Sequence, residues 1–450
     1  MQRSLTRKSM LRWFEQGFTP LSEHRIGLEW EKEILHPDGR RLRFDEPGGV
    51  EDLLKGLTRF GWTAGFEGAH VVRMDRDQAS VTIEPGGQVE LATPPRVGIA
   101  ELEKDVRGHL REIQAVLGDS GARPVAIGYT PIEPVAEIPF VPKKRYAIME
   151  RVFRRTGTMG HGMMKGTTSV QVSVDVVSRE DASKKVDVAL GISPLVTALF
   201  ANSPLADGRD TGWASWRARC WQHTDPTRTG LLGDTVGGGF TYERYLDWLL
   251  DVPMLVYRSG DTVKPAHGRT FRDFVSSGVE GREADFDDLA LHINTVFPEV
   301  RVTRNYIEMR SADNVPLPMI PALAALWKGL MYDPEALNTA ASVAAAIPSW
   351  ERARVQHVAA SDGLAGRFKR RRLRSWMAWV LEIAAEGLAR QAPDGPAEVA
   401  YLTPLQELVE RGESPAIALW RAFERDEDGI VDAIAYPPVD DIPAVNPGAR

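Results

Sequence analysis

Glutamate residues recur at every second position in the segment RIGLEWEKEIL (25–35). In a β-strand, Glu29, Glu31 and Glu33 all project from one face, and the apolar residues that alternate with them occupy the other. The alternation itself favours a strand with two unlike faces. A charged face of this kind is most often exposed to solvent, because charged side chains are seldom buried.

Two further segments place acids at comparable positions. The segment SVTIEPGGQVELATPP (80–95) predicts a hairpin, because its two glycines permit a turn that bulky side chains resist. Glu84 and Glu90 then lie on either side of that turn. The segment NYIEMRSAD predicts a strand in which Glu308 and Arg310 share a face. Three strands therefore present acids on one side.

The chemistry of these acids depends on whether the three faces converge. Converging carboxylates repel one another, so cations must offset their charge. Oxygen ligands without cysteine or paired histidine favour Mg²⁺ or Mn²⁺ over zinc. Because such ions, held by carboxylates, usually serve substrate phosphates, the pattern favours chemistry on ATP.

Arginines supply the opposite charge. Arg310 lies beside the acids, and the segment SWRARCWQHTDPTRTG contributes Arg217, Arg219 and Arg228. Their planar guanidinium groups suit carboxylate or phosphate, although a single arginine more often forms a surface ion pair. The basic run KRRRLR (369–374) is placed on a predicted helix and interpreted as a solvated face.

Other candidate motifs give only weak evidence of function. The segment GMMKGTTS (162–169) has Lys-Gly-Thr where a phosphate loop requires Gly-Lys-Ser/Thr. GDTVGGGF (233–240) lacks the dinucleotide-binding spacing, and we interpret it as a mobile loop of the kind that often carries function. The nine histidines form no HxxxH pair and no recognisable Ser-His-Asp order, which disfavours zinc proteases and leaves hydrolases unsupported.

The elements that must position these residues follow from periodicity and turn residues. We predict helices over 1–18, 97–117, 178–204, 241–250 and 286–297, with Ser178 and Asp181 capping the third. Beyond the three segments already described, we predict strands over 125–131, 169–177 and 253–258.

Strands thus occupy residues 20–315. They alternate rather than forming solid apolar runs, and a hairpin lies among them, so an antiparallel α+β sheet fits better than a doubly wound parallel one. Without an internal repeat or long linker, we predict one catalytic domain over 1–435 that is helical over 316–425. Residues 436–450 are predicted to form a Pro-rich, poorly anchored tail.

Composition excludes several classes of protein. The 450 residues include 55 Lys and Arg against 62 Asp and Glu, a net charge of −7 that argues against nucleic-acid binding by broad phosphate neutralisation. The hydrophobic fraction of 43% excludes wholesale disorder. No apolar run approaches a membrane span, and residues 1–18 lack the apolar core of a secretory signal, so a cytoplasmic location is expected. Cys220 is the single cysteine, which excludes an intrachain disulfide and a cysteine-based zinc site.

At the level of motifs, the sequence resembles the plant-type glutamate-cysteine ligases, a family shared with many bacteria. The matching stretches run in order over about residues 5–335, with weaker similarity to about 425. They are RIGLEWEKE, EPGGQVEL, IPFVPKKRYAIM, SVQVSVD, TALFANSP, DPTRTGLL, YLDWLLDVPM, FPEVRV and YIEMRSAD. EPGGQ and EMR in this order and setting are specific.

The resemblance implies a fold like the catalytic part of glutamine synthetase, in which an antiparallel sheet curves into a funnel flanked by helices. It implies that ATP phosphorylates the γ-carboxylate of glutamate and that the amine of cysteine then displaces phosphate. It places Mg²⁺ or Mn²⁺ on Glu29, Glu31, Glu84, Glu90 and Glu308. It gives catalytic roles to Arg217, Arg310 and Glu308, and the predicted substrate contacts are Arg217, Arg310, Gln171 and Arg228.

The chain departs from the family pattern beside these positions. Glu33-Ile34-Leu35 replaces aromatic and glycine residues, Ser173 replaces an asparagine, and Ser311 replaces a glycine. These departures leave two alternatives: a ligase that joins glutamate to another amine, and an amino-acid or nucleotide sensor without turnover. All five acids are present, which argues against the sensor. The expected partners are the small molecules glutamate, cysteine and ATP. We expect no binding to nucleic acid or membrane and no required protein partner.

Overall fold

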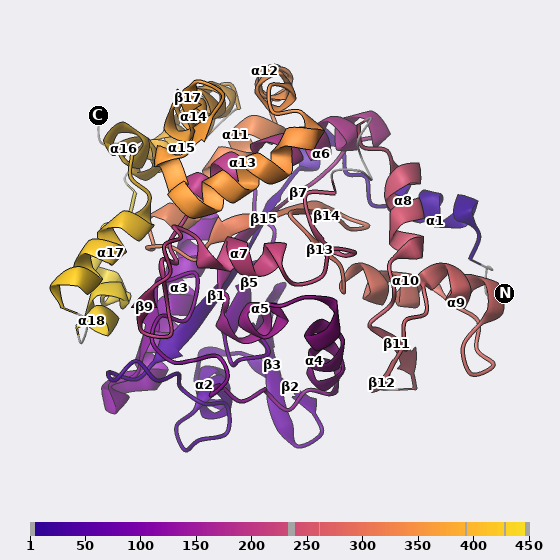
Figure 1. The fold of residues 1–450 in the computed structure, drawn as a ribbon, viewed down its shortest axis with the longest axis horizontal. Coiled ribbons are helices and arrows are strands. Elements are labelled where there is room, and N and C mark those ends of the chain that lie inside the picture. Colours follow the sequence, from indigo (N-terminus) through magenta and orange to yellow (C-terminus); the bar gives the residue numbers. More distant parts are fainter. Residues whose placement is uncertain (1–4, 233–238, 261, 392–393, 427–428, 446–450) are drawn as a thin grey trace.

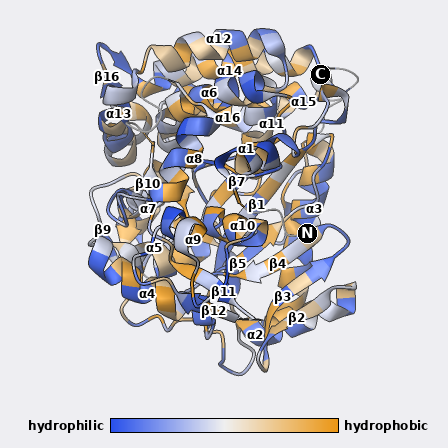
Figure 2. Cartoon of the chain, turned by 90° about the vertical axis from the view of Figure 1, so that its right-hand side faces the viewer, coloured by the Kyte–Doolittle hydropathy of each residue, from blue (hydrophilic) through white to orange (hydrophobic). Residues whose placement is uncertain are grey.

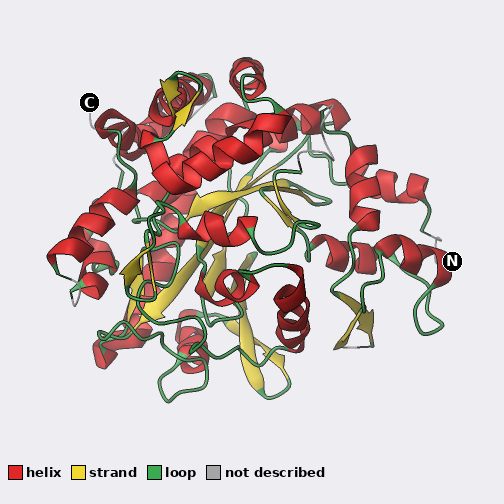
Figure 3. Ribbon diagram, in the orientation of Figure 1, coloured by secondary structure: helices red, strands yellow, loops and turns green. Residues whose placement is uncertain are grey.

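A computed structural model describes residues 5–232, 239–260, 262–391, 394–426 and 429–445. Helices surround a central sheet on several sides (Figures 1 and 3). The strands of that sheet are β1 (Ile26–Leu35), β2 (Thr63–Glu67), β3 (His70–Arg76), β4 (Ala79–Ile83), β5 (Val89–Ala92), β6 (Arg123–Val125), β7 (Ser169–Val174), β14 (Val300–Val302) and β15 (Ile307–Asp313).

The helices fall into two sets along the chain. Those before the last third are α1 (Arg7–Glu15), α2 (Val50–Gly56), α3 (Ile99–Leu117), α4 (Lys144–Thr156), α5 (Gly160–Gly166), α6 (Arg179–Leu199), α7 (Trp216–Gln222), α8 (Tyr242–Asp251), α9 (Phe271–Ser277) and α10 (Phe286–Ile293). The last third contains α11 (Met319–Met331), α12 (Pro334–Ala345), α13 (Ser349–Asp362), α14 (Leu373–Ala389), α15 (Gly395–Glu398), α16 (Thr403–Arg411), α17 (Pro415–Arg425) and α18 (Ile430–Ile434).

The central sheet has nine strands in the order β14-β15-β7-β1-β5-β4-β3-β2, and β6 pairs with the far end of β1. Its pairings are antiparallel, which confirms the predicted α+β class. Four two-stranded sheets lie outside it: β8 (Leu205–Ala206) with β9 (Arg209–Asp210), β10 (Thr229–Gly230) with β13 (Phe297–Pro298), β11 (Val256–Ser259) with β12 (Thr262–Pro265), and β16 (Arg367–Phe368) with β17 (Arg371–Arg372).

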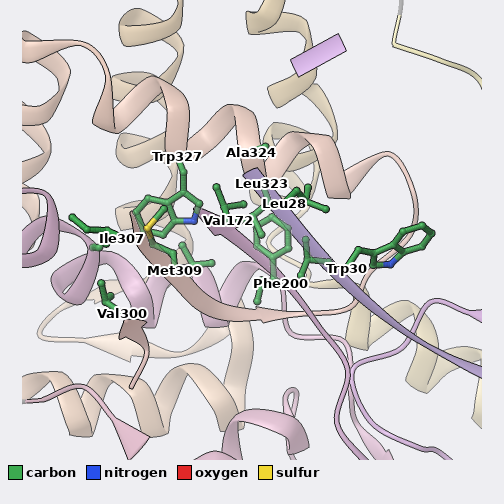
Figure 4. Close-up of a cluster of buried hydrophobic side chains, with 14 of the residues drawn as sticks. Leu28, Trp30, Val172, Phe200, Val300, Ile307, Met309, Leu323, Ala324 and Trp327 are labelled. Atoms are coloured by element: carbon green, nitrogen blue, oxygen red, sulfur yellow. The ribbon is translucent and has the colours of Figure 1, made fainter. Parts of the chain in front are cut away.

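One face of the sheet forms the main hydrophobic core. The apolar residues of β1, β7 and β15 point at α6 and α11, where Trp30, Phe200 and Trp327 are almost fully buried (Figure 4). Figure 2 shows the helical layer with α6, α11, α12 and α14 at one end of the molecule and β2 to β5 toward the other. Since one face packs against helices, the opposite face is left to carry the polar side chains.

Most predicted elements are present with shorter bounds. Ser178 caps α6 by accepting from the amide of Asp181, as predicted. The predicted strand over 125–131 is wrong beyond Val125, where β6 ends and an irregular segment begins. The basic run 369–374 was expected on a helix, but residues 369–372 form the turn and second strand of the β16–β17 hairpin, and Leu373 and Arg374 begin α14. The loop expected at 233–240 lies largely outside the described residues.

The C-terminal segment is anchored, contrary to expectation, as far as the structure describes it. Tyr436 and Val439 are buried, and Gln114 of α3 donates to the carbonyl of Pro437. Arg107, also on α3, donates to the carbonyl of Ile442. Within the described residues, no helix combines the length and apolar character needed to cross a membrane.

Candidate active site

A cavity of about 280 Å³ opens on the polar face of the central sheet. Four of the five predicted acids line it: Glu29, Glu31, Glu84 and Glu90. Arg301, Arg310 and Gln171 line it from the neighbouring strands. Helix α4, helix α10 and the β11–β12 hairpin close its other side with Arg145, Tyr146, Met149, Leu291, Asn294, Leu255 and Val263.

The register of the sheet brings the acids together. Glu31 of β1 lies directly opposite Glu90 of β5, and Glu29 lies opposite Gln171 of β7. Gln171 and Ser169 both donate to the Glu31 carboxylate, at 3.2 and 2.8 Å. The strand faces therefore converge at these residues, which is the condition on which the interpretation of the acids depended.

The electrostatics of the acids reflect burial and crowding. Burial and the carboxylates of Glu90 and Glu84 raise the pKa of Glu31 from 4.5 to about 8. Burial and the charges of Glu308 and Glu90 raise the pKa of Glu29 well above its ordinary value, and burial with Glu84 raises that of Glu90. Since like charges confined in a dry cavity disfavour ionisation, the site gains stability when a cation enters it.

The EPGGQ turn fixes the position of Glu84. A Cβ on Gly86 would stand 2.5 Å from the carbonyl oxygen of Lys165, so no side chain fits between the turn and α5. Gly87 has φ of 88°, which favours glycine. The side chain of Gln88 accepts from the amide of Gly86 at 2.9 Å and donates to the carbonyl of Thr167 at 2.9 Å. The motif thus holds the hairpin against the chain that leads into β7.

Glu33, the third glutamate of β1, has a different role. There β1 pairs with β6, beyond the cavity, and Glu33 is fully buried in an ion pair with Arg41. Arg41 also donates to the carbonyls of Gly86 and Lys165. This buried pair therefore braces the EPGGQ turn from behind. Burial outweighs the nearby arginine and raises the pKa of Glu33 to about 7.

Glu308 lies between two arginines rather than in the cavity wall. Its oxygens accept from Arg310 at 2.8 Å and from Arg301 at 3.0 Å, and the Nε of Arg301 lies 2.8 Å from the carboxylate as an ion pair. Burial raises its pKa, but these two guanidinium groups outweigh burial and hold the pKa at about 2. Glu308 thus orients Arg301 and Arg310, and it is not among the described residues that line the cavity, so its metal contact stays a prediction.

Arg301 is one of the cavity residues that the sequence analysis missed. It stands between two valines in β14, directly opposite Glu308 in the register of β15. The alternation in FPEVRV was the available signal, since the valines point to the core and the arginine to the other face. Arg310 completes this group by donating to the amide oxygen of Gln171.

Arg217 and Arg228 lie outside the set of described residues that line the cavity. Arg217 is 3% exposed and donates to the carbonyl of Arg310 at 2.8 Å, so it braces the backbone of β15. Arg228 is buried and donates to the Asp225 carboxylate and to the carbonyls of Pro253 and Thr295. These contacts give Arg228 a structural role and do not support its predicted contact with substrate.

The cavity residues suit a divalent cation that takes part of its oxygen ligands from a bound nucleotide. Among the residues that the structure describes, no group of three or more acidic, histidine or cysteine side chains is placed to hold a metal ion. Mg²⁺ is commonly held by one or two carboxylates together with phosphate oxygens and water. The crowded acids of β1 and the hairpin suit that arrangement, in which the nucleotide supplies the missing oxygens.

The fold, an antiparallel sheet flanked by helices, is similar to that of two solved ligase structures. A glutamate-cysteine ligase from Francisella tularensis in complex with AMP matches with a TM-score of 0.52 at 12% identity, covering 92% of this chain and 88% of that one. A bifunctional glutathione synthetase from Pasteurella multocida matches with a TM-score of 0.52 at 13% identity, covering 96% of this chain and 52% of that one.

Comparison with related sequences identifies the protein family to which the chain belongs. The chain is 33% identical over 440 residues to glutamate–cysteine ligase A, chloroplastic, from Oryza sativa subsp. indica, covering 96% of this chain and 88% of that protein. It is 34% identical over 436 residues to the chloroplastic enzyme of Arabidopsis thaliana, covering 96% and 82%. The model of the glutamate-cysteine ligase family 2 (GCS2) matches residues 25–435, and the chain belongs to that family.

Proposed function

We propose that this protein is an ATP-dependent ligase that forms γ-glutamylcysteine from L-glutamate and L-cysteine, the first step of glutathione synthesis. The observation that carries the proposal is the cavity in which Glu29, Glu31, Glu84 and Glu90 face Arg310, within a chain of this family. Opposite charges on two sides of one cavity suit a reaction between an anionic phosphate and a carboxylate.

The arginines are proposed to hold glutamate. Arg310 is ion-paired to Glu308 and donates to Gln171, so its guanidinium plane is fixed before substrate arrives. A planar group fixed in this way binds a carboxylate through two parallel hydrogen bonds. Arg301 contributes positive charge beside it.

The acids are proposed to hold Mg²⁺, or Mn²⁺, with the phosphates of ATP. When bound, the ion supplies charge that favours transfer to the γ-carboxylate of glutamate. An oxygen of that carboxylate bonds to the γ-phosphorus and ADP leaves. The cysteine nitrogen then bonds to the acyl carbon, phosphate leaves, and the amine loses a proton. The cavity residues exclude water that would hydrolyse the acyl phosphate.

A coupled assay of ADP release tests this function. Mg-ATP and glutamate are supplied with each of the twenty amino acids in turn, and we expect release to be fastest with cysteine. Release with another amine only would identify a glutamate ligase with a different acceptor. Binding of glutamate and ATP without amine-dependent release would contradict the enzyme and support the sensor. The cytoplasmic location and the absence of a required protein partner stay predictions.

A further inference from the structure

A second cavity, of about 840 Å³, lies away from the active site. Its lining residues belong to α6, the start of α8, α12 and the start of α13, and Figure 1 shows where these helices lie. None of the described residues that line it also lines the active-site cavity. Its volume is three times the 280 Å³ of the active-site cavity, so it is large enough to enclose a small molecule.

Arg352 is the buried cation of this cavity. The residue is 8% exposed, and its Nε donates to the carbonyl of Ile347 at 3.3 Å. Among the described residues, neither terminal nitrogen of its guanidinium group has a hydrogen-bond or ion-pair partner. A buried guanidinium group without an anion is costly, and burial lowers the pKa of Arg352. The side chain is thus set to receive an anionic group.

The N-terminus of α13 adds to this site. The helix begins at Ser349, and no side chain caps it. Ser349 and Trp350 both line the cavity. The amide of Glu351 donates to the carbonyl of Pro348 at 2.8 Å, so the amides of Ser349 and Trp350 are the first-turn donors that an anion could meet, and the helix dipole favours an anion there. This end of the cavity therefore combines backbone donors with the guanidinium group of Arg352.

The lining of the cavity also includes acidic residues, and one of them can meet a cationic group. Asp187 of α6 is half-buried, and one of its oxygens accepts from the amide of Phe240 at 2.9 Å. Its charge interacts with that of Arg352, yet the structure shows no ion pair between them. Glu243 pairs with Arg179, and Glu180 accepts from Ser178, so Asp187 is the acid left to meet a ligand.

We propose that this cavity binds a zwitterion of the α-amino-acid class, free or at the ends of a short peptide. Its carboxylate meets Arg352 and the first turn of α13, and its ammonium group meets Asp187. Trp350, which is 82% exposed at the rim, offers its indole ring to an apolar side chain of the ligand. Because Arg352 and Asp187 offer one charge of each sign, the site matches a ligand that carries both charges, and it is distinct in chemistry from the active site.

Fluorine NMR on protein labelled with 5-fluorotryptophan tests the proposal, with the Trp350 signal assigned through Trp350→Phe. L-Phenylalanine and L-alanyl-L-phenylalanine are the two zwitterionic probes, for the free amino acid and the peptide. N-acetyl-L-phenylalanine and L-phenylalaninamide each lack one charge. We expect a saturable shift of the Trp350 signal with at least one zwitterion and binding weaker by about tenfold or more when either charge is missing.

Substitutions of cavity residues test whether the probes bind in this cavity. Arg352→Met and Asp187→Asn should each weaken binding by about tenfold or more. Arg354→Met is the matched control, since Arg354 is exposed on the same helix and pairs with Glu351. If Arg352→Met does not fold, Ser349→Pro removes one backbone donor at a position where proline is tolerated, and it should also weaken binding. The proposal is overturned by the absence of a saturable shift, by equal affinity in the folded variants, or by a response to inorganic phosphate alone.

Discussion

Replacement of Glu31 by glutamine should stabilise the unliganded protein and remove its activity. Glu31 lies opposite Glu90 and accepts hydrogen bonds from Ser169 and Gln171. An amide of the same shape keeps the packing but removes a charge that burial and neighbouring acids disfavour. It also removes a proposed ligand for the cation, so ligation should be lost.

The size of the effect follows from the pKa of Glu31, which is raised from 4.5 to about 8. Between these two values the folded protein binds more protons than the unfolded chain, so stability is lost as the pH rises. From about pH 5 to pH 8 the free energy of unfolding of the wild type falls by about 3 kcal/mol. Glu31→Gln lacks this titration, so it should exceed the wild type in free energy of unfolding by about that amount at pH 8 and approach it at pH 5.

Urea unfolding followed by circular dichroism, without Mg²⁺ or nucleotide, measures this difference across the pH range. Glu424→Gln, at an exposed position of α17, controls for the loss of a surface charge and should follow the wild type. If the free energies of wild type and Glu31→Gln run parallel from pH 5 to pH 8, the crowding of acids inferred from the structure is wrong.

Three further predictions concern single residues. Arg310→Lys should raise the KM for glutamate by about tenfold or more in steady-state kinetics, because a bidentate contact becomes a point charge; an unchanged KM would refute that contact. Cys220→Ser should keep most activity, and diamide should not alter the wild type, because the thiol is fully buried and burial raises its pKa; a reversible loss on oxidation would contradict this. Gly86→Ala should lower the free energy of unfolding by about 1–3 kcal/mol, since its Cβ would meet the carbonyl of Lys165; equal stability in urea would show that the turn can shift.

The strands that carry the acids were predictable because their periodicity is local. Alternation in β1 and β15 places Glu29, Glu31 and Arg310 on polar faces without knowledge of any partner strand. Helix α6 was predictable from its cap at Ser178. Strands β2 and β3 were missed, since β2 exposes Phe66 and neither strand alternates cleanly.

The roles of several polar residues depend on contacts with segments far away in the sequence, which local patterns do not predict. Glu33 shares the period of its neighbours, but β1 leaves β5 for β6 at that point and Arg41 neutralises the carboxylate. Glu308 was expected to be a metal ligand, and local alternation could place Arg301 on a polar face, but the pairing of β14 with β15 is what sets Arg301 opposite Glu308. The role of Arg228 depends on carbonyls at Pro253 and Thr295, which no local pattern predicts.

The fate of a labelled oxygen tests the central claim, that the protein activates the γ-carboxylate of glutamate for attack by cysteine. Glutamate labelled with oxygen-18 in its γ-carboxylate is supplied with Mg-ATP and cysteine, and Glu84→Gln serves as the control, in which turnover should be lost. The account predicts that each released phosphate carries one labelled oxygen and that γ-glutamylcysteine keeps the other, as measured by mass spectrometry. Release of unlabelled phosphate, or of a product without γ-glutamylcysteine, would contradict it.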